Sequence, residues 1–223
     1  MAGFPFHVVA FDLDGTLADT APDLAAALNH ALGALGRPEV DAESVRHLVG
    51  HGARALLRNA LGDEELVERG LPIYLDFYAA NICFGTRRYP GLEQAMDSLA
   101  ARNVQLAICT NKPERLTHLL VEALGWTGRF AAIVGADTLK VRKPDPLPLL
   151  EAIARAGGGR AAFVGDSITD AETARAAAVP FVAVSFGFSD RPVAALGADA
   201  VIDDYGELVG ALERLGGPRP ALG

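Results

Sequence analysis

The sequence has few cysteines and no excess of basic residues. Its 223 residues include two cysteines, Cys83 and Cys109, whose spacing fits no metal-binding motif, and Cys109 lies in an apolar run that predicts a buried thiol. This argues against a disulfide framework and fits a reducing compartment. A formal net charge of −8 offers no general basic surface to nucleic acid or anionic membranes. We therefore expect neither a nucleic acid polymer nor a membrane as a partner.

Long apolar runs are also missing. No run approaches the length of about 20 residues that spans a bilayer, and we expect no signal peptide before the first apolar segment. These features predict a cytoplasmic protein. Half of the residues are hydrophobic, which is enough to bury a substantial core. The oligomeric state stays open between a monomer and a homodimer.

The chain is organised around the pattern Asp-Leu-Asp-Gly-Thr at positions 12–16, directly after the apolar run 8–11. The run predicts a buried strand of a parallel sheet, and alternation along a strand would let Asp12 and Asp14 point the same way. Two neighbouring carboxylates repel, so they require a raised pKa, a cation or a bound metal. An Asp-Gly pair alone is typical of a turn, but chance gives the full pattern in about one chain per thousand of this length.

Helical patterns dominate the segment between Leu17 and Arg88, where we expect no strand. The third helical pattern covers 64–84, and Pro72 predicts a kink or a restart within it. This segment is typical of a separate helical bundle. We expect a helical cap at 19–87, a core formed by 1–18 and 88–216, and a flexible tail at 217–223.

Strand and helix patterns alternate in the second half of the chain. We expect strands over 104–109, 130–134, 161–164, 181–185 and 200–202, and helices over 91–102, 113–125, 146–156, 169–178 and 207–215. This alternation predicts an α/β fold with a doubly wound, Rossmann-like parallel sheet and helices on both faces. In such a sheet, ligands bind beyond the carboxyl ends of the strands.

Polar side chains follow three of the predicted strands. They are Asp12 and Asp14, Thr110 and Asn111, and Asp166 and Ser167, with Asp170 four positions after Asp166. Four carboxylates without a histidine cluster favour a hard cation such as Mg²⁺, which shares its shell with phosphate. Lys143, in a proline-rich segment, could neutralise a carboxylate nucleophile and a phosphate together.

Each of these residues also has a simpler interpretation. Thr110 and Asn111 could satisfy loop backbone, Lys143 could be a solvated loop lysine, and Ser167 could cap a helix. Their common position at one edge of the predicted sheet favours the functional interpretation.

The chain resembles the haloacid dehalogenase-like hydrolases, and among them the phosphoglycolate phosphatases. It carries the four motifs of this family, which are the pattern at positions 12–16, Thr110-Asn111, Lys143-Pro144, and Gly165-Asp166-Ser167 with Asp170. The resemblance covers nearly the whole chain, and the helical insertion lies where this family places its cap. It implies a phosphoric monoester hydrolase in which Asp12 attacks phosphorus to form a phosphoaspartyl intermediate. Asp14 would protonate the leaving alkoxide and then take a proton from the hydrolytic water.

The resemblance also implies the metal ligands and the phosphate-binding groups. Mg²⁺ would be held by the Asp12 carboxylate, the Asp14 backbone carbonyl and Asp166, with Asp170 as a direct or an indirect ligand and Ser167 near the metal waters or Asp166. The phosphoryl oxygens would be bound by Thr110, the Asn111 backbone and Lys143.

Substrate selection is expected in the cap, at His51, Gly52 and Arg54. The glycine would allow close backbone approach, and Arg54 could either pair with a substrate carboxylate or be an ordinary surface residue. Phosphoglycolate phosphatases have a similar loop, often with Asn where His51 stands. The partner is therefore a small phosphorylated metabolite, with 2-phosphoglycolate as the first expectation.

Other functions on the same scaffold stay open. They are a sugar-phosphate phosphatase, a phosphomutase, a nucleotide phosphatase and a non-enzymatic binding module. Asp14 argues against a dehalogenase, which lacks this acid/base. A phosphonate-cleaving enzyme would need a cap lysine, and no lysine occurs between Leu17 and Arg88.

Overall fold

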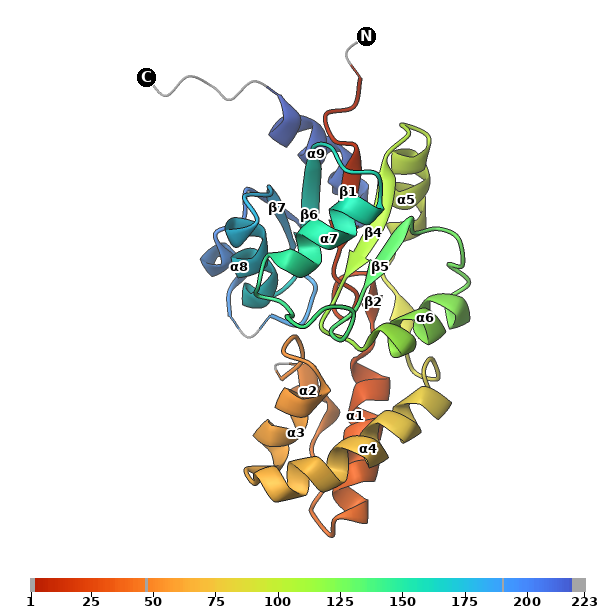
Figure 1. The fold of residues 1–223 in the computed structure, drawn as a ribbon, viewed down its shortest axis with the longest axis vertical. Helices are drawn as coiled ribbons and strands as arrows, with labels where there is room; N and C mark the ends of the chain where they lie inside the picture. Colours follow the sequence, from red (N-terminus) through yellow and green to blue (C-terminus); the bar gives the residue numbers. More distant parts are fainter. Residues whose placement is uncertain (1–2, 47, 190, 218–223) are drawn as a thin grey trace.

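The computed structural model describes residues 3–46, 48–189 and 191–217. Most of the predicted tail at 217–223 lies outside the described residues. Figure 1 shows a lobe built on a sheet and, below it, a lobe of helices. Within the described part of the chain, no helix is long and apolar enough to cross a membrane.

The core is a six-stranded parallel sheet in the order β5-β4-β1-β6-β7-β8. Its strands are β1 (Val8–Phe11), β4 (Gln105–Cys109), β5 (Ala132–Val134), β6 (Ala161–Gly165), β7 (Phe181–Val184) and β8 (Ala200–Ile202). β1 pairs with β4 on one side and with β6 on the other, and all its residues are buried. A strand covered on both faces needs apolar residues throughout, which explains its unbroken run.

Helices cover both faces of the sheet, as the sequence predicts (Figure 1). α7 (Leu147–Arg155) and α8 (Ile168–Ala176) pack with Val8 and Ala10 of β1. The opposite face is covered by α5 (Leu92–Ala100), α6 (Glu114–Ala123) and α9 (Leu208–Gly216), which pack with Val9 and Phe11. Short 3₁₀ turns, η1 (Val193–Leu196) and η2 (Tyr205–Glu207), complete the second half.

The helical lobe has its own apolar core. It contains α1 (Ala21–Ala34), α2 (Ala42–Arg46), α3 (Ala53–Leu61) and α4 (Glu64–Ala80), which bury Leu28, Leu57 and Tyr74 among others. α4 continues through Pro72, so the predicted restart does not occur. A proline inside a helix removes one backbone hydrogen bond. Packing of α4 against α1 and α3 compensates for that loss.

A two-stranded ribbon joins the lobes, and it corrects the expectation of no strand in this segment. β2 (Ala18–Asp19) pairs antiparallel with β3 (Arg87–Arg88). Strands of two residues carry no periodicity, so the sequence gives no signal for them. Asp23 holds the segment in which the chain returns from the helical lobe to the core. Its carboxylate accepts hydrogen bonds from the backbone N of Gly85 at 2.7 Å and of Thr86 at 2.8 Å.

Candidate active site

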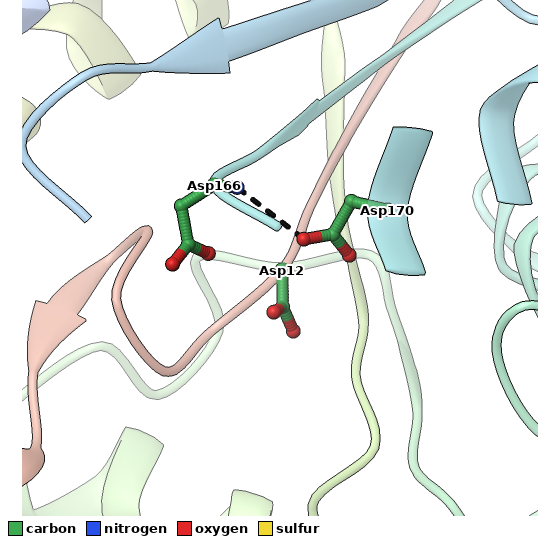
Figure 2. A group of neighbouring side chains, drawn as sticks. All are labelled: Asp12, Asp166 and Asp170. Carbon is green, nitrogen blue, oxygen red and sulfur yellow. Dashed lines mark hydrogen bonds between the residues drawn. The ribbon is translucent and has the colours of Figure 1, made fainter. Parts of the chain in front are cut away.

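Three buried carboxylates meet at the carboxyl edge of the sheet. Asp12 follows β1, Asp166 follows β6, and Asp170 lies in the first turn of α8 (Figure 2). Their exposed fractions are 4%, 2% and 0%, and one oxygen from each lies within 4.8 Å of the others. The chain continues from β1 to β4 on one side and reaches β6 on the other, so this edge is the switch point of the sheet.

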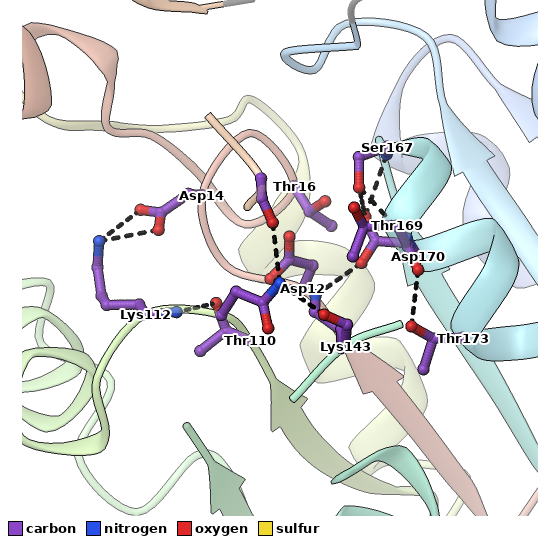
Figure 3. Close-up of polar contacts among 12 residues, drawn as sticks. Asp12, Asp14, Thr16, Thr110, Lys112, Lys143, Ser167, Thr169, Asp170 and Thr173 are labelled. Atoms are coloured by element: carbon purple, nitrogen blue, oxygen red, sulfur yellow. Dashed lines mark hydrogen bonds and ion pairs between the residues drawn. The ribbon is translucent and has the colours of Figure 1, made fainter. Parts of the chain in front are cut away.

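Asp14 has different partners from Asp12. Its carboxylate accepts hydrogen bonds from Nζ of Lys112 at 2.7 and 2.8 Å and from the hydroxyl of Thr20 at 2.7 Å. β1 ends at Phe11, so strand alternation does not extend to Asp14. Figure 3 shows Asp14 and Lys112 on one side of Asp12, with Asp170 on the other. The two motif carboxylates therefore have different charged partners.

Lys143 neutralises part of the carboxylate cluster. Its Nζ lies 2.9 Å from Oδ1 of Asp12 and 2.6 Å from Oδ1 of Asp170. Burial disfavours a charged ammonium, but these two carboxylates outweigh it and raise the pKa of Lys143 above its usual value. Lys143 is therefore a permanent cation beside Asp12.

The carboxylates themselves resist ionisation. Burial raises the pKa of Asp12 to about 6, helped by the charges of Asp170 and Asp14 and opposed by Lys143. Burial and the neighbouring charges of Asp170 and Asp12 raise the pKa of Asp166 well above its usual range. The cluster carries more negative charge than Lys143 can offset.

Asp170 organises the turn that carries Asp166. Its Oδ2 accepts from the Ser167 hydroxyl at 2.6 Å and from the backbone N of Ser167 at 3.1 Å, while the backbone N of Asp170 donates to the Ser167 hydroxyl. This is a capping box at the start of α8. Ser167 therefore caps a helix, and through Asp170 that cap supports Lys143.

Thr16 of the first motif and Phe188 both contact Asp166. The hydroxyl of Thr16 donates to its Oδ1 at 2.8 Å, and the backbone N of Phe188 donates to its Oδ2 at 2.7 Å. Gly15 has a φ of 83°, and a Cβ there would lie 2.4 Å from Oδ2 of Asp166. Glycine is thus required both for the turn and for the close approach.

The donor set fits a hard divalent cation. All the ligand atoms are carboxylate oxygens, and the cluster has an excess of negative charge. Oδ1 of Asp12 is buried and accepts no well-directed hydrogen bond among the described residues, whereas both oxygens of Asp166 do. Asp12 and Asp166 could hold the ion, with Asp170 beside them.

Thr110 and Asn111 follow β4 and are buried next to this cluster. The Asn111 amide donates to the carbonyl of Lys143 at 3.1 Å and to the carbonyl of Gly50, in the helical lobe, at 3.0 Å. Thr110 accepts a hydrogen bond from the backbone N of Lys112. The Asn111 side chain therefore ties together the Lys143 segment and the cap loop.

A small cavity of about 40 Å³ lies between the two lobes. Its polar lining comes from Asp12, Asp14, Thr110, Asn111 and Lys112. The helical lobe contributes apolar and aromatic side chains, among them Leu24, Leu56, Tyr74 and Tyr78, together with Gly50 and Gly52. A substrate here would contact groups of both lobes.

The three cap residues predicted for specificity have different surroundings. Gly52 lines the cavity, has a φ of 86°, and a Cβ there would lie 3.1 Å from the Asn111 carbonyl oxygen. His51 Nδ1 lies 3.2 Å from the hydroxyl of Thr169, in α8. Arg54 forms an ion pair with Glu68 on the surface of the cap and is not part of the cavity lining.

Lys112 is a functional candidate that the sequence analysis missed. It directly follows Thr110 and Asn111, and its side chain is 3% exposed. A lysine next to a predicted phosphate-binding pair was the available signal. Its pairing with Asp14 joins residues 98 positions apart and was not visible in the sequence.

The chain is also similar to known proteins. The family model described as haloacid dehalogenase-like hydrolase matches residues 9–184. A phosphoglycolate phosphatase from Mesorhizobium japonicum is 46% identical over 217 residues, covering 93% of this chain and 96% of the relative. Another from Rhodospirillum rubrum is 41% identical over 224 residues, covering 95% and 92%.

Solved structures share the same architecture. The crystal structure of a predicted phosphoglycolate phosphatase from Haemophilus somnus matches with a TM-score of 0.87 at 28% identity, covering 92% of this chain and 97% of that one. CbbY from Rhodobacter sphaeroides, solved in complex with phosphate, matches with a TM-score of 0.80 at 22% identity, covering 93% and 99%. At that identity the second match shows a common fold alone.

Proposed function

Because this chain belongs to the haloacid dehalogenase-like hydrolase family, we propose that it is a Mg²⁺-dependent phosphatase that hydrolyses 2-phosphoglycolate through a phosphoaspartyl intermediate. One observation carries the proposal: Asp12 and Asp14 line a single cavity but have separate partners. Two carboxylates in different environments can perform different steps of one reaction. The name shared by relatives at 41–46% identity supports the choice of substrate.

In the first step, the carboxylate of Asp12 attacks phosphorus. A P–O bond forms to Asp12 while the bond from phosphorus to the substrate's ester oxygen breaks. Asp14, in its protonated form, gives its proton to the leaving alkoxide, so the products are an alcohol and a phosphoaspartyl group. Asp14 is left as a carboxylate, which its Lys112 and Thr20 partners stabilise.

In the second step, water attacks the phosphorus of the phosphoaspartyl group. Asp14 takes a proton from this water, the bond between phosphorus and Asp12 breaks, and inorganic phosphate leaves. Asp14 ends the cycle protonated again. Lys143, Thr110 and the Asn111 backbone bind the phosphoryl oxygens during both steps.

We propose that the carboxylates of Asp12 and Asp166 and the backbone carbonyl of Asp14 would hold Mg²⁺. When bound, it would screen the repulsion between the Asp12 carboxylate and the phosphate. Asp170 lies beside these residues and supports the ion directly or indirectly, while its Oδ1 binds Lys143 and its Oδ2 accepts from Ser167.

We also propose that residues 19–87 form the cap over a core of 1–18 and 88–216. The bond from Asn111 to the Gly50 carbonyl and the close approach of Gly52 to Asn111 hold the cap against the core. A closed cap excludes water other than the hydrolytic one. The apolar and aromatic side chains that the cap contributes to the cavity favour a short phosphomonoester over sugar phosphates and nucleotides, whose hydroxyl groups would lack partners there.

A phosphate-release assay over a panel of phosphomonoesters tests the proposal. We expect the highest kcat/KM for 2-phosphoglycolate, loss of turnover on chelation, and recovery with Mg²⁺. Asp12→Asn should abolish turnover, and an active Asp12→Asn enzyme would refute the assigned nucleophile. Preferred turnover of a sugar phosphate or a nucleotide, or its isomerisation without phosphate release, would replace the substrate assignment.

A further inference from the structure

The cavity contains one cation that the catalytic steps above do not place on the substrate. Among the described residues that line it, Lys112 is the only one with a positive charge. Its ammonium is buried, lies 2.7 and 2.8 Å from the Asp14 oxygens, and sits 4.6 Å from the centre of the Tyr78 ring. Burying a lysine ammonium costs free energy unless groups of opposite charge bind it.

The pairing of Lys112 with Asp14 leaves it able to bind a further anion. A lysine ammonium has three donors, and Asp14 occupies one side of it. Asp14 also accepts a hydrogen bond from the Thr20 hydroxyl, so Lys112 is not its only partner. An anion that enters the cavity beside Asp14 would therefore meet an N–H donor with a full positive charge.

A hydroxyl without a partner lies on Tyr78, the residue whose ring faces the Lys112 ammonium. The hydroxyl of Tyr78, on cap helix α4, is buried and has no hydrogen-bond partner among the described residues. Tyr78 lines the same cavity and is 1% exposed. A buried hydroxyl without a partner is unusual in a folded protein and indicates a missing acceptor. An anion held by Lys112 would supply that acceptor.

The order of the residues also matches the order of groups in a short substrate. Asp12 attacks phosphorus, and Asp14 donates a proton to the ester oxygen. Lys112 contacts Asp14 on the side that faces away from Asp170 (Figure 3). In a phosphorylated 2-hydroxy acid, a carboxylate is one carbon from the ester oxygen. The phosphoryl group, the ester oxygen and the carboxylate of such a substrate would contact Asp12, Asp14 and Lys112, respectively.

We propose that Lys112 and Tyr78 form a carboxylate-binding subsite that restricts this enzyme to short phosphomonoesters bearing a carboxylate beside the ester carbon. The inference rests on the proposed phosphatase function and identifies the residues that select its substrate. Lys112 comes from the core and Tyr78 from the cap, so the carboxylate binds between the two lobes. The apolar side chains Leu24, Leu56 and Leu116 around them strengthen the charge pairing by excluding water.

Arg54 is the competing cation for this role. It lies on the cap, but its guanidinium is paired with Glu68 and its side chain is 36% exposed. An ion pair at the surface would have to break before Arg54 could reach a substrate. Lys112 already lines the cavity, so it can contact a substrate there while it stays next to Asp14.

The test compares kcat/KM for 2-phosphoglycolate with kcat/KM for ethyl phosphate, which has a methyl group in place of the carboxylate. Any effect of a variant on Asp14 acts on both substrates and cancels in this ratio. We expect Lys112→Met to lower the ratio by about 10- to 100-fold and Tyr78→Phe by about 3- to 10-fold, chiefly through KM for 2-phosphoglycolate. Arg58→Met is the matched control, because Arg58 pairs with Glu64 on the cap surface, and its ratio should be unchanged.

Arg54→Met separates the two candidate cations. We expect the ratio of the two kcat/KM values to be unchanged in Arg54→Met. A large fall of this ratio in Arg54→Met, together with a wild-type ratio in Lys112→Met, would overturn the inference. If Lys112→Met turns over neither substrate, equilibrium binding of both compounds to Asp12→Asn with and without Lys112→Met decides. A selective loss of 2-phosphoglycolate binding supports the subsite, and equal losses overturn it.

The remaining outcomes also decide the question. If Lys112→Met does not fold, Tyr78→Phe removes a single oxygen, and an unchanged ratio in that variant overturns the subsite. A wild-type enzyme that turns over ethyl phosphate as well as 2-phosphoglycolate contradicts the substrate in the proposed function. A wild-type preference that persists in Lys112→Met and Tyr78→Phe contradicts the subsite alone.

Discussion

The hydroxyl of Thr16 donates a hydrogen bond to Oδ1 of Asp166 at 2.8 Å, across 150 positions of the sequence. This bond joins the first motif to the last carboxylate motif, and both residues are buried. It fixes the orientation of a carboxylate whose pKa burial raises well above its usual range. Thr16 is therefore a positioning residue for the proposed metal site.

Thr16→Val should weaken Mg²⁺ binding with little change in shape. The variant removes the donor to Asp166, so the concentration of Mg²⁺ that gives half-maximal activity should rise by about 10-fold. Unfolding by urea without Mg²⁺ should show a loss of about 1–2 kcal/mol. Thr127→Val, at an exposed threonine, is the control and should change neither quantity. An unchanged Mg²⁺ requirement in Thr16→Val would contradict the positioning role.

Lys143→Met should be costly both to folding and to catalysis. Without its ammonium, the buried carboxylates of Asp12 and Asp170 lose their counter-charge, which should destabilise the protein by about 3–5 kcal/mol. Turnover should fall by at least about 10³-fold, because binding of the phosphoryl oxygens is also lost. Lys140→Met, at an exposed lysine three positions away, should behave like the wild type. Urea unfolding and phosphate release measure the two effects.

Asp14→Asn should affect both steps but depend on the leaving group. Removing the acid should lower kcat for 2-phosphoglycolate by about 10²- to 10⁴-fold. The loss should be smaller for 4-nitrophenyl phosphate, whose leaving group needs no proton, and the phosphoaspartyl form should then accumulate to a level visible by intact mass. Asp41→Asn, at an exposed position, is the control. An equal loss for both substrates without accumulation would argue against the acid/base assignment.

Stability without Mg²⁺ should fall as the pH rises. The pKa of Asp12 is raised from 3.8 to about 6 in the folded state, so the proton is favoured by folding. Its contribution is fully present below about pH 3.8 and is lost as the pH passes about 6, a change of up to about 3 kcal/mol. The raised pKa of Asp166 acts in the same direction.

Thermal melting from pH 4 to pH 8 measures this effect as the difference between the wild type and Asp12→Asn. When Mg²⁺ is chelated, the melting temperature of the wild type relative to that of Asp12→Asn should fall as the pH rises. Mg²⁺ should raise the melting temperature most above pH 6, because it binds the ionised carboxylates. A pH-independent difference, or no effect of Mg²⁺ at concentrations that support activity, would contradict a strained carboxylate cluster.

The alternating α/β architecture was predictable because its elements are local. The buried run at β1 and the helix after Pro113 follow from apolar periodicity, and the observed elements differ from the predicted ones by one or two residues at most ends. The ribbon of β2 and β3 was not predictable, because it forms only when the insertion brings Asp19 and Arg87 together. The continuity of α4 through Pro72 depends on packing against α1 and α3.

The candidate site divides in the same way. Asp12, Asp166 and Asp170 could be selected because strand ends of a parallel sheet meet at one edge. Tyr78 could not be selected, since nothing in its local sequence distinguishes it, and the only signal for Lys112 was its position next to Thr110 and Asn111. Arg54 was a reasonable candidate from its charge, and its surface ion pair with Glu68 becomes visible only when α3 and α4 pack together.

The sequence alone therefore determines the fold class and the set of candidate site residues. The pattern at positions 12–16, with Thr110 and Asp166 at strand ends and Lys143 in a proline-rich loop, predicts a nucleophile, an acid/base and a phosphate site in a fold built from local patterns. The tertiary structure decides the partners of each carboxylate and the lining of the cavity. The physical reason is that charge pairing and burial depend on distances between residues far apart in the chain, such as Asp14 and Lys112, and no local pattern records those distances.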